Sequence, residues 1–186
     1  MELTTVAALF ERFLARGKGA YTLSQVSQLE HGLQAAALAQ ERKLGDVLTI
    51  AALFHDLGHL PSATNISLAE RGIDDRHEHA SARILERVFG QGVSEPVRLH
   101  VLAKRYLCTV EEGYLESLDG DSQCSLAVQG GALTASEIAS FKSERYFRKS
   151  LDLRRIDDDA KVPGLDVPGL DAYREMALDL SLHERA

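Results

Sequence analysis

Apolar residues recur along the chain three and four residues apart, and no stretch alternates convincingly between apolar and polar positions as a half-buried strand would. This pattern predicts an all-α fold. The predicted helices cover residues 4–16, 25–42, 47–57, 146–160 and 170–183, and others begin at His77, near Pro96 and at Thr134. Ser24 is the expected N-cap of the second helix. Residues 60–76 and 117–133 lack periodicity, which predicts two loops.

The segment from Val47 to Leu53 is apolar on nearly all sides, which predicts a buried helix. It runs directly into His55 and Asp56, and a second histidine, His59, follows. A buried imidazole beside a carboxylate needs something that neutralises the charge and satisfies the polar atoms. A metal ion would do both.

Composition narrows the possible classes of protein. A chain of 186 residues with 45% hydrophobic and 26% charged residues predicts one globular domain covering residues 1–186. The formal net charge of −7 argues against nucleic acid or an anionic membrane as the main partner. No signal peptide or membrane span is recognisable, so we expect a cytoplasmic protein. We also expect a monomer or a weak homodimer. Cys108 and Cys124 are expected to be free thiols.

Six residues on five predicted segments could bind metal together: His31, His55, Asp56, His77, His100 and Asp157. A single histidine is most often a satisfied core or surface residue, but these recur near apolar helix faces that must pack together. Four of the six suffice for one metal, and a second metal would be held by His77 and His100 if Asp56 bridges the two. Imidazole with carboxylate suits iron, manganese or zinc. His79 points roughly 200° away from His77 on a helix and is expected at the surface.

The pattern of His31, His55-Asp56 and Asp157 resembles the motif of the HD-domain superfamily, which consists of all-α metalloproteins, mostly phosphohydrolases. The additional His77 and His100 resemble its mixed-valent diiron oxygenase branch of the PhnZ/TmpB type, which cleaves carbon–phosphorus bonds. Further shared stretches are Arg-Gly-Ile-Asp-Asp-Arg-His-Glu, Val-Ser-Glu-Pro-Val-Arg-Leu-His-Val, Ala-Lys-Arg-Tyr-Leu-Cys, Leu-Ala-Val-Gln-Gly-Gly and Leu-Arg-Arg-Ile-Asp-Asp. They cover most of the chain, from about residue 21 to residue 160.

The resemblance implies an HD-domain helical bundle and a non-haem diiron dioxygenase of organophosphonate catabolism. One iron would be held by His31, His55, Asp56 and Asp157, and the other by His77, His100 and the bridging Asp56. The two irons would form a mixed-valent Fe(II)/Fe(III) pair, with O2 as co-substrate. The partner would be a small-molecule 1-hydroxyphosphonate, from which oxygen insertion at the hydroxylated carbon releases phosphate and a carboxylate.

A phosphonate dianion needs cations and hydrogen-bond donors. Lys104 lies one helical turn after His100, and Arg154 lies three residues before Asp157, so each shares a helix face with a proposed ligand. From spacing alone these could equally be solvated side chains. The resemblance favours phosphonate binding by both, together with Ser125 and Gln129, and implies that His59 contacts the substrate and that Tyr21 covers the iron until the substrate arrives.

Ser24 departs from the family pattern. Members that bind a primary amine carry a glutamate there, and a serine serves an ammonium group less well. A trimethylammonium group has no N–H donors and is held by aromatic faces. We therefore expect 1-hydroxy-2-(trimethylammonio)ethylphosphonate as the substrate, with glycine betaine and phosphate as products. The alternatives are 2-amino-1-hydroxyethylphosphonate giving glycine and phosphate, a metal-dependent phosphohydrolase, and a non-catalytic HD module, which the complete ligand set disfavours.

Overall fold

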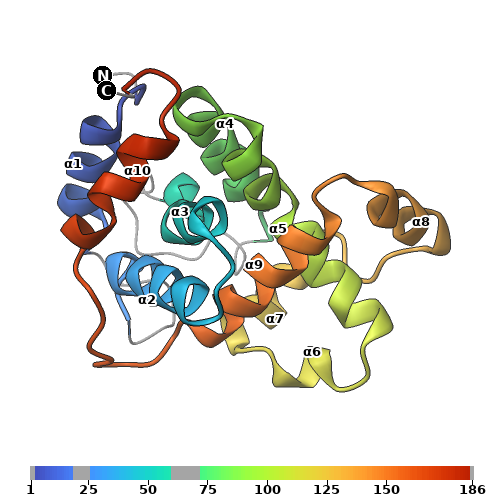
Figure 1. Ribbon diagram of the computed structural model, residues 1–186. Coiled ribbons are helices and arrows are strands. Elements are labelled where there is room, and N and C mark those ends of the chain that lie inside the picture. Colours follow the sequence, from blue (N-terminus) through green and yellow to red (C-terminus); the bar gives the residue numbers. More distant parts are fainter. Residues whose placement is uncertain (1–2, 19–25, 60–71, 185–186) are drawn as a thin grey trace.

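The computed structural model describes residues 3–18, 26–59 and 72–184, and all regular elements in these ranges are helical, so the all-α prediction is confirmed (Figure 1). The elements in chain order are α1 (Val6–Arg16), α2 (Gln28–Glu41), α3 (Asp46–Phe54), η1 (Leu57–His59), α4 (His77–Phe89), α5 (Gln91–Val110), α6 (Tyr114–Ser117), α7 (Gly120–Val128), α8 (Ala135–Ser143), α9 (Phe147–Asp159), η3 (Leu170–Tyr173) and α10 (Arg174–Leu180).

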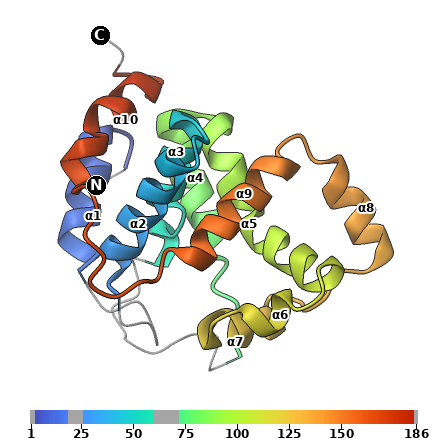
Figure 2. The same ribbon diagram turned by 60° about the horizontal axis from the view of Figure 1, so that its bottom comes forward.

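Helix α3 lies at the centre of the bundle. Every residue from Leu48 to Phe54 is buried, as the all-round apolar pattern predicts, and α1, α2, α4, α5, α9 and α10 contribute most of the rest of the main core. Phe54 receives the ring edges of Phe10 and Phe13, with ring centroids 5.7 and 5.4 Å away. Helices α1 and α10 lie side by side against one flank of the bundle (Figures 1 and 2).

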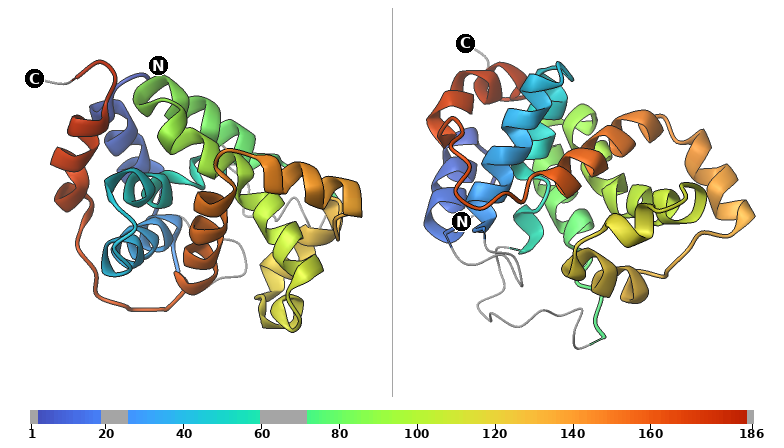
Figure 3. Two further views of the ribbon diagram at one scale, coloured as in Figure 1. Left: turned by 45° about the vertical axis from the view of Figure 1, so that its right-hand side comes forward. Right: turned by 90° about the horizontal axis from the view of Figure 1, so that it is seen from below.

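Helix α5 extends the molecule away from α1 and α10. Its second half packs with α8 and α9 around Leu99, Ala103 and Phe141, and α6 covers Leu107 at its end. In every view α8 lies at the opposite end of the molecule from α1 and α10 (Figure 3). The long helix α5 therefore connects the main core with this smaller cluster.

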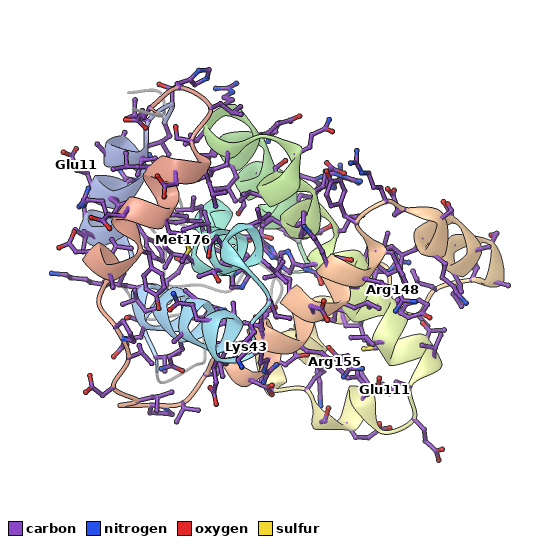
Figure 4. The ribbon with its side chains drawn as sticks, viewed as in Figure 1. Glu11, Lys43, Glu111, Arg148, Arg155 and Met176 are labelled. Atoms are coloured by element: carbon purple, nitrogen blue, oxygen red, sulfur yellow. The ribbon has the colours of Figure 1, made fainter. Side chains whose placement is uncertain are left out.

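Helix α9 places two arginines that are adjacent in sequence on different faces, one buried and one exposed. Arg155 lies on the outer face and reaches Glu111 at the end of α5, with Nη2 2.5 Å from the carboxylate oxygen (Figure 4). Arg154 is buried on the inner face, only 3% exposed. This inner face is the one that carries Asp157, also buried.

Several predicted boundaries were wrong. Helix α2 begins at Gln28 with Ser27 as its N-cap, in a capping box with Glu30, whereas Ser24 lies outside the described residues. Helix α5 begins at Gln91 rather than near Pro96, because Gly90 adopts a φ of 76° and lets the chain pass from α4 directly into α5. The predicted last helix is divided into η3 and α10.

The loop predicted for residues 117–133 was also wrong. Residues 120–128 form α7, whose N-terminus is capped by the Asp119 side chain accepting from the Ser122 amide. The composition is rich in Gly, Ser and Asp and has no apolar stripe, so this helix depends on its cap and on its neighbours. Among the described helices, none combines the length and apolar composition needed to cross a bilayer.

The close contact of α2 with α3 depends on Gly32. A Cβ there would lie 2.5 Å from the Leu53 carbonyl oxygen and 2.7 Å from Phe13 Cζ. We expect Gly32→Ala to lower the free energy of unfolding in urea by about 1–3 kcal/mol, because it overpacks the core. Gly92→Ala is the matched control, since its nearest neighbour would be Val47 Cγ1 at 3.7 Å, and it should be neutral or stabilising by about 1 kcal/mol. Equal effects of the two variants would contradict this account.

Candidate metal centre

Two groups of buried side chains, each able to hold a metal ion, lie next to each other in the bundle. The first contains His31 from α2, His55 after the end of α3, and Asp157 from α9. His31 Nε2 lies 3.1 Å from His55 Nε2 and 3.2 Å from Asp157 Oδ1. Three elements far apart in sequence thus bring two imidazole nitrogens and one carboxylate oxygen together.

The second group contains Asp56, His77 at the start of α4 and His100 in the middle of α5. Nε2 of His77 lies 3.2 Å from Nε2 of His100, and both face Asp56 Oδ1, at 3.6 and 3.8 Å. Asp56 also lies 3.6 Å from His55 Nε2 and 3.8 Å from His31 Nε2. Its carboxylate is therefore the element shared by the two groups, where a bridging ligand would be needed.

Hydrogen bonds fix which nitrogen of each imidazole carries the proton. Nδ1 of His31 lies 2.9 Å from the Ala160 carbonyl, Nδ1 of His55 2.7 Å from the Ala52 carbonyl, and Nδ1 of His100 2.7 Å from the Val97 carbonyl. A carbonyl oxygen can only accept, so each Nδ1 must donate. Each Nε2 then presents a lone pair to the centre, as a metal ligand does.

This arrangement is unfavourable without a cation. In each group two lone pairs point at each other from little more than 3 Å, and Asp157 Oδ1 is buried and accepts no hydrogen bond from the described part of the chain. Burying such atoms without a partner is costly. Nitrogen and carboxylate donors with this spacing fit a first-row transition metal in each group.

The pKa values reflect the same crowding. Burial lowers the pKa of His55, but Asp56 and Asp157 outweigh it and raise the value to about 9. Burial and the neighbouring His77 lower the pKa of His100 to about 3. Burial raises the pKa of Asp56, but the surrounding histidines hold it well below its ordinary value.

The two basic residues predicted for an anion both lie beside the metal centre. Arg154 Nη1 donates to Asp157 Oδ2 at 2.7 Å, and Lys104 Nζ donates to Ser125 Oγ at 2.7 Å. Both side chains are almost fully buried, unlike the solvated basic residues that spacing alone allowed. Burial and the nearby Arg154 lower the pKa of Lys104 to about 7. Gln129 caps the end of α7, the helix that carries Ser125.

Sequence reasoning missed a third basic residue and the serine around which the three gather. Ser122 Oγ lies 3.3 Å from Arg154 Nη2 and 3.4 Å from Lys161 Nζ, and its carbonyl oxygen lies 3.4 Å from Lys104 Nζ. Lys161 also lies 3.9 Å from Asp157 Oδ1. The available signal was the spacing of four residues between Asp157 and Lys161. This spacing indicates a contact only if the backbone at Asp157 is helical.

Asp75 and Gln28 were also missed. Asp75 Oδ2 lies 2.7 Å from His59 Nδ1 and its Oδ1 lies 2.9 Å from His77 Nδ1, whereas Gln28 donates to the Asp56 carbonyl at 2.6 Å. Asp75 lies in the shared stretch Arg-Gly-Ile-Asp-Asp-Arg-His-Glu but was given no role there, and Gln28 lies outside the shared stretches. His79 has a side chain 51% exposed, as expected for a surface residue. Tyr21 and Ser24 lie outside the described residues.

Comparison with known proteins agrees with this geometry. Residues 29–128 match the family model described as HD domain. The chain is 44% identical over 172 residues to a hydroxymethylphosphonate dioxygenase of Gimesia maris, covering 90% of this chain and 84% of the relative. It is 32% identical over 163 residues to a [1-hydroxy-2-(trimethylamino)ethyl]phosphonate dioxygenase (glycine-betaine-forming) of Leisingera caerulea, covering 88% and 82%. The chain therefore belongs to the HD domain family, in its branch of phosphonate dioxygenases.

Proposed function

We propose that the protein is a non-haem diiron dioxygenase that cleaves the carbon–phosphorus bond of a 1-hydroxyphosphonate. The observation that carries this proposal is the pair of metal-binding groups sharing Asp56, with Lys104 and Arg154 buried beside them. A phosphohydrolase needs a metal and cations as well, but the two similar dioxygenases favour oxygen chemistry. The cytoplasmic location and the monomer or weak homodimer stay predictions.

The proposed ligands are the six residues that the sequence motif indicates, with Asp56 as the bridge. Iron held there in a mixed-valent Fe(II)/Fe(III) state would supply the activation of O2. The bundle contributes donors in fixed orientation, because three of the four imidazoles are held by backbone carbonyls. All six proposed ligands are buried in the bundle, which shields them from bulk water.

The substrate's phosphonate group would be bound on the side of α7 and α9. Lys104, Arg154 and Ser125 offer a cation, a planar guanidinium and a hydroxyl to its oxygens, and Gln129 is the fourth proposed donor. His59 would contact the substrate, and Tyr21 would cover the iron before the substrate arrives. The reaction is balanced without an external reductant, because both atoms of O2 enter the products, a carboxylate and phosphate.

The substituent on the hydroxylated carbon distinguishes two substrates. The higher identity to a hydroxymethylphosphonate dioxygenase favours hydroxymethylphosphonate, which would give formate and phosphate. Ser24 stands where family members that bind a primary amine carry a glutamate. A serine there suits the amine-free substrate. It also suits the trimethylammonium compound, which the second similar enzyme supports. We propose hydroxymethylphosphonate first and the trimethylammonium compound second.

The metal proposal predicts different effects for two neighbouring histidines of α4. After anaerobic reconstitution the chain should bind about two irons, and His77→Ala should bind about one, because only the second group loses a ligand. Turnover should fall by roughly 100-fold or more. Removing a group that only orients a metal ligand already costs up to about that much, and His77 is a ligand itself. The exposed His79→Ala should keep both irons and full turnover. Unchanged iron content in His77→Ala would refute the assignment.

The substrate proposal predicts an order of kcat/KM with O2 present. Phosphate release should be fastest from hydroxymethylphosphonate, slower from the trimethylammonium compound and slowest from 2-amino-1-hydroxyethylphosphonate, since a missing carboxylate partner costs an ammonium about 1.5–3 kcal/mol, or roughly 10- to 150-fold. A preference for the primary amine would overturn the argument from Ser24. Hydrolysis of phosphate esters without O2 would instead support a phosphohydrolase.

A further inference from the structure

Asp75 connects two histidines that come from different parts of the chain. Its Oδ2 lies 2.7 Å from Nδ1 of His59 at the end of η1, and its Oδ1 lies 2.9 Å from Nδ1 of His77 at the start of α4. Oδ1 also lies 3.3 Å from the His77 backbone nitrogen, which holds the carboxylate against the helix N-terminus. Each carboxylate oxygen thus has an imidazole of its own.

The two imidazoles lie face to face. Their ring centroids are 3.9 Å apart and the ring planes are inclined by only 22°. Because both Nδ1 atoms point at the same carboxylate and the rings are nearly parallel, both Nε2 atoms point away from Asp75 on the same side. Nε2 of His77 lies 3.6 Å from Asp56, so the His59 ring stacked on it lies beside the second metal group.

The backbone enforces this stacking. A Cβ on Gly58 would lie 2.2 Å from the His77 carbonyl oxygen and 2.8 Å from its Cα, so η1 can approach the start of α4 only with glycine at this position. The Gly58 amide donates to Ser81 Oγ at 2.8 Å, which fastens η1 to α4. His59 is therefore held over His77 by more than its own side chain.

A carboxylate can only accept hydrogen bonds, so Asp75 requires both imidazoles to carry their proton on Nδ1. Glu78 does not compete for this role, because its nearer oxygen is 3.8 Å from His77 Nδ1. With Nδ1 protonated, the lone pair of each neutral imidazole is on Nε2, and that of His77 is directed at the second metal group.

The geometry points to Asp75 as a positioning residue that sets the tautomer of a metal ligand, His77, and of a substrate-facing histidine, His59, at the same time. Metal binding in the second group and the proton acceptor beside it thereby depend on one carboxylate. The assignment of His59 to the substrate rests on the proposed function, whereas the effect on His77 does not.

Asp75→Asn can keep one of the two hydrogen bonds but not both. An asparagine has one accepting oxygen, so its amide nitrogen must face the other Nδ1–H, and that imidazole has to move its proton to Nε2 or turn away. Asp74→Asn is the matched control, because it removes the same charge from the adjacent residue, which among the described residues accepts from the Arg76 amide and contacts neither imidazole. Asp75→Glu restores a carboxylate.

The experiment measures iron per chain after reconstitution and dialysis, zinc affinity by calorimetry, and imidazole tautomers by long-range proton–nitrogen NMR on the zinc-loaded protein. For Asp75→Asn we expect the second metal to bind roughly 10- to 100-fold more weakly, the first to be unchanged, and His59 or His77 to shift from the Nδ1–H to the Nε2–H tautomer. Asp74→Asn should match the wild type, and Asp75→Glu should recover part of the loss.

Two results would overturn the inference. The first is wild-type affinity of the second site with both Nδ1–H tautomers retained in Asp75→Asn. The second is equal weakening of both metal sites together with a lower melting temperature, which would make Asp75 merely structural. None of these measurements needs a substrate, so they stand even if the protein fails to act on any 1-hydroxyphosphonate.

Discussion

The structure depends on how the repulsion between the buried nitrogen and oxygen atoms of the proposed metal ligands is compensated. Four imidazole nitrogens and the carboxylates of Asp56 and Asp157 converge on a small buried volume. An apolar core tolerates such a cluster only if cations neutralise it. Because the donors come from α2, α4, α5, α9 and the segment after α3, the same ions would hold five parts of the bundle together. Folding and metal binding are then expected to be coupled.

The architecture serves this convergence. The apolar helix α3 ends at Phe54, so His55 and Asp56 leave the helix at the point where the other elements meet. Two of the neighbouring elements approach so closely that a side chain would clash, at Gly32 beside α3 and at Gly58 beside α4. Small residues near the motif thus determine how tightly the proposed ligands are brought together.

The sequence predicted the strongly periodic helices, because an apolar stripe is a local signal, and its histidine motif named the six residues that the structure brings together in two groups. The helix from Gly120 to Val128 could not be predicted in this way, since its residues carry no stripe and its cap becomes meaningful only beside α5 and α9. Asp75 and Lys161 escaped for a related reason. Each has one partner close in sequence, but the contacts of Asp75 with His59 and of Lys161 with Ser122 form only when the fold brings distant segments together.

The way each imidazole is anchored differs, and the difference bears on how this centre can change. His31, His55 and His100 are oriented by backbone carbonyls. Substituting the residue that supplies such a carbonyl leaves the carbonyl in place as long as the local backbone keeps its conformation. Within the described part of the chain, His77 is the imidazole whose Nδ1 is held by a side chain, Asp75. A single nucleotide change can therefore reach the second metal position through its support while the first stays intact. Of the four imidazoles, that of His77 is therefore the most open to reorientation by evolution or protein engineering.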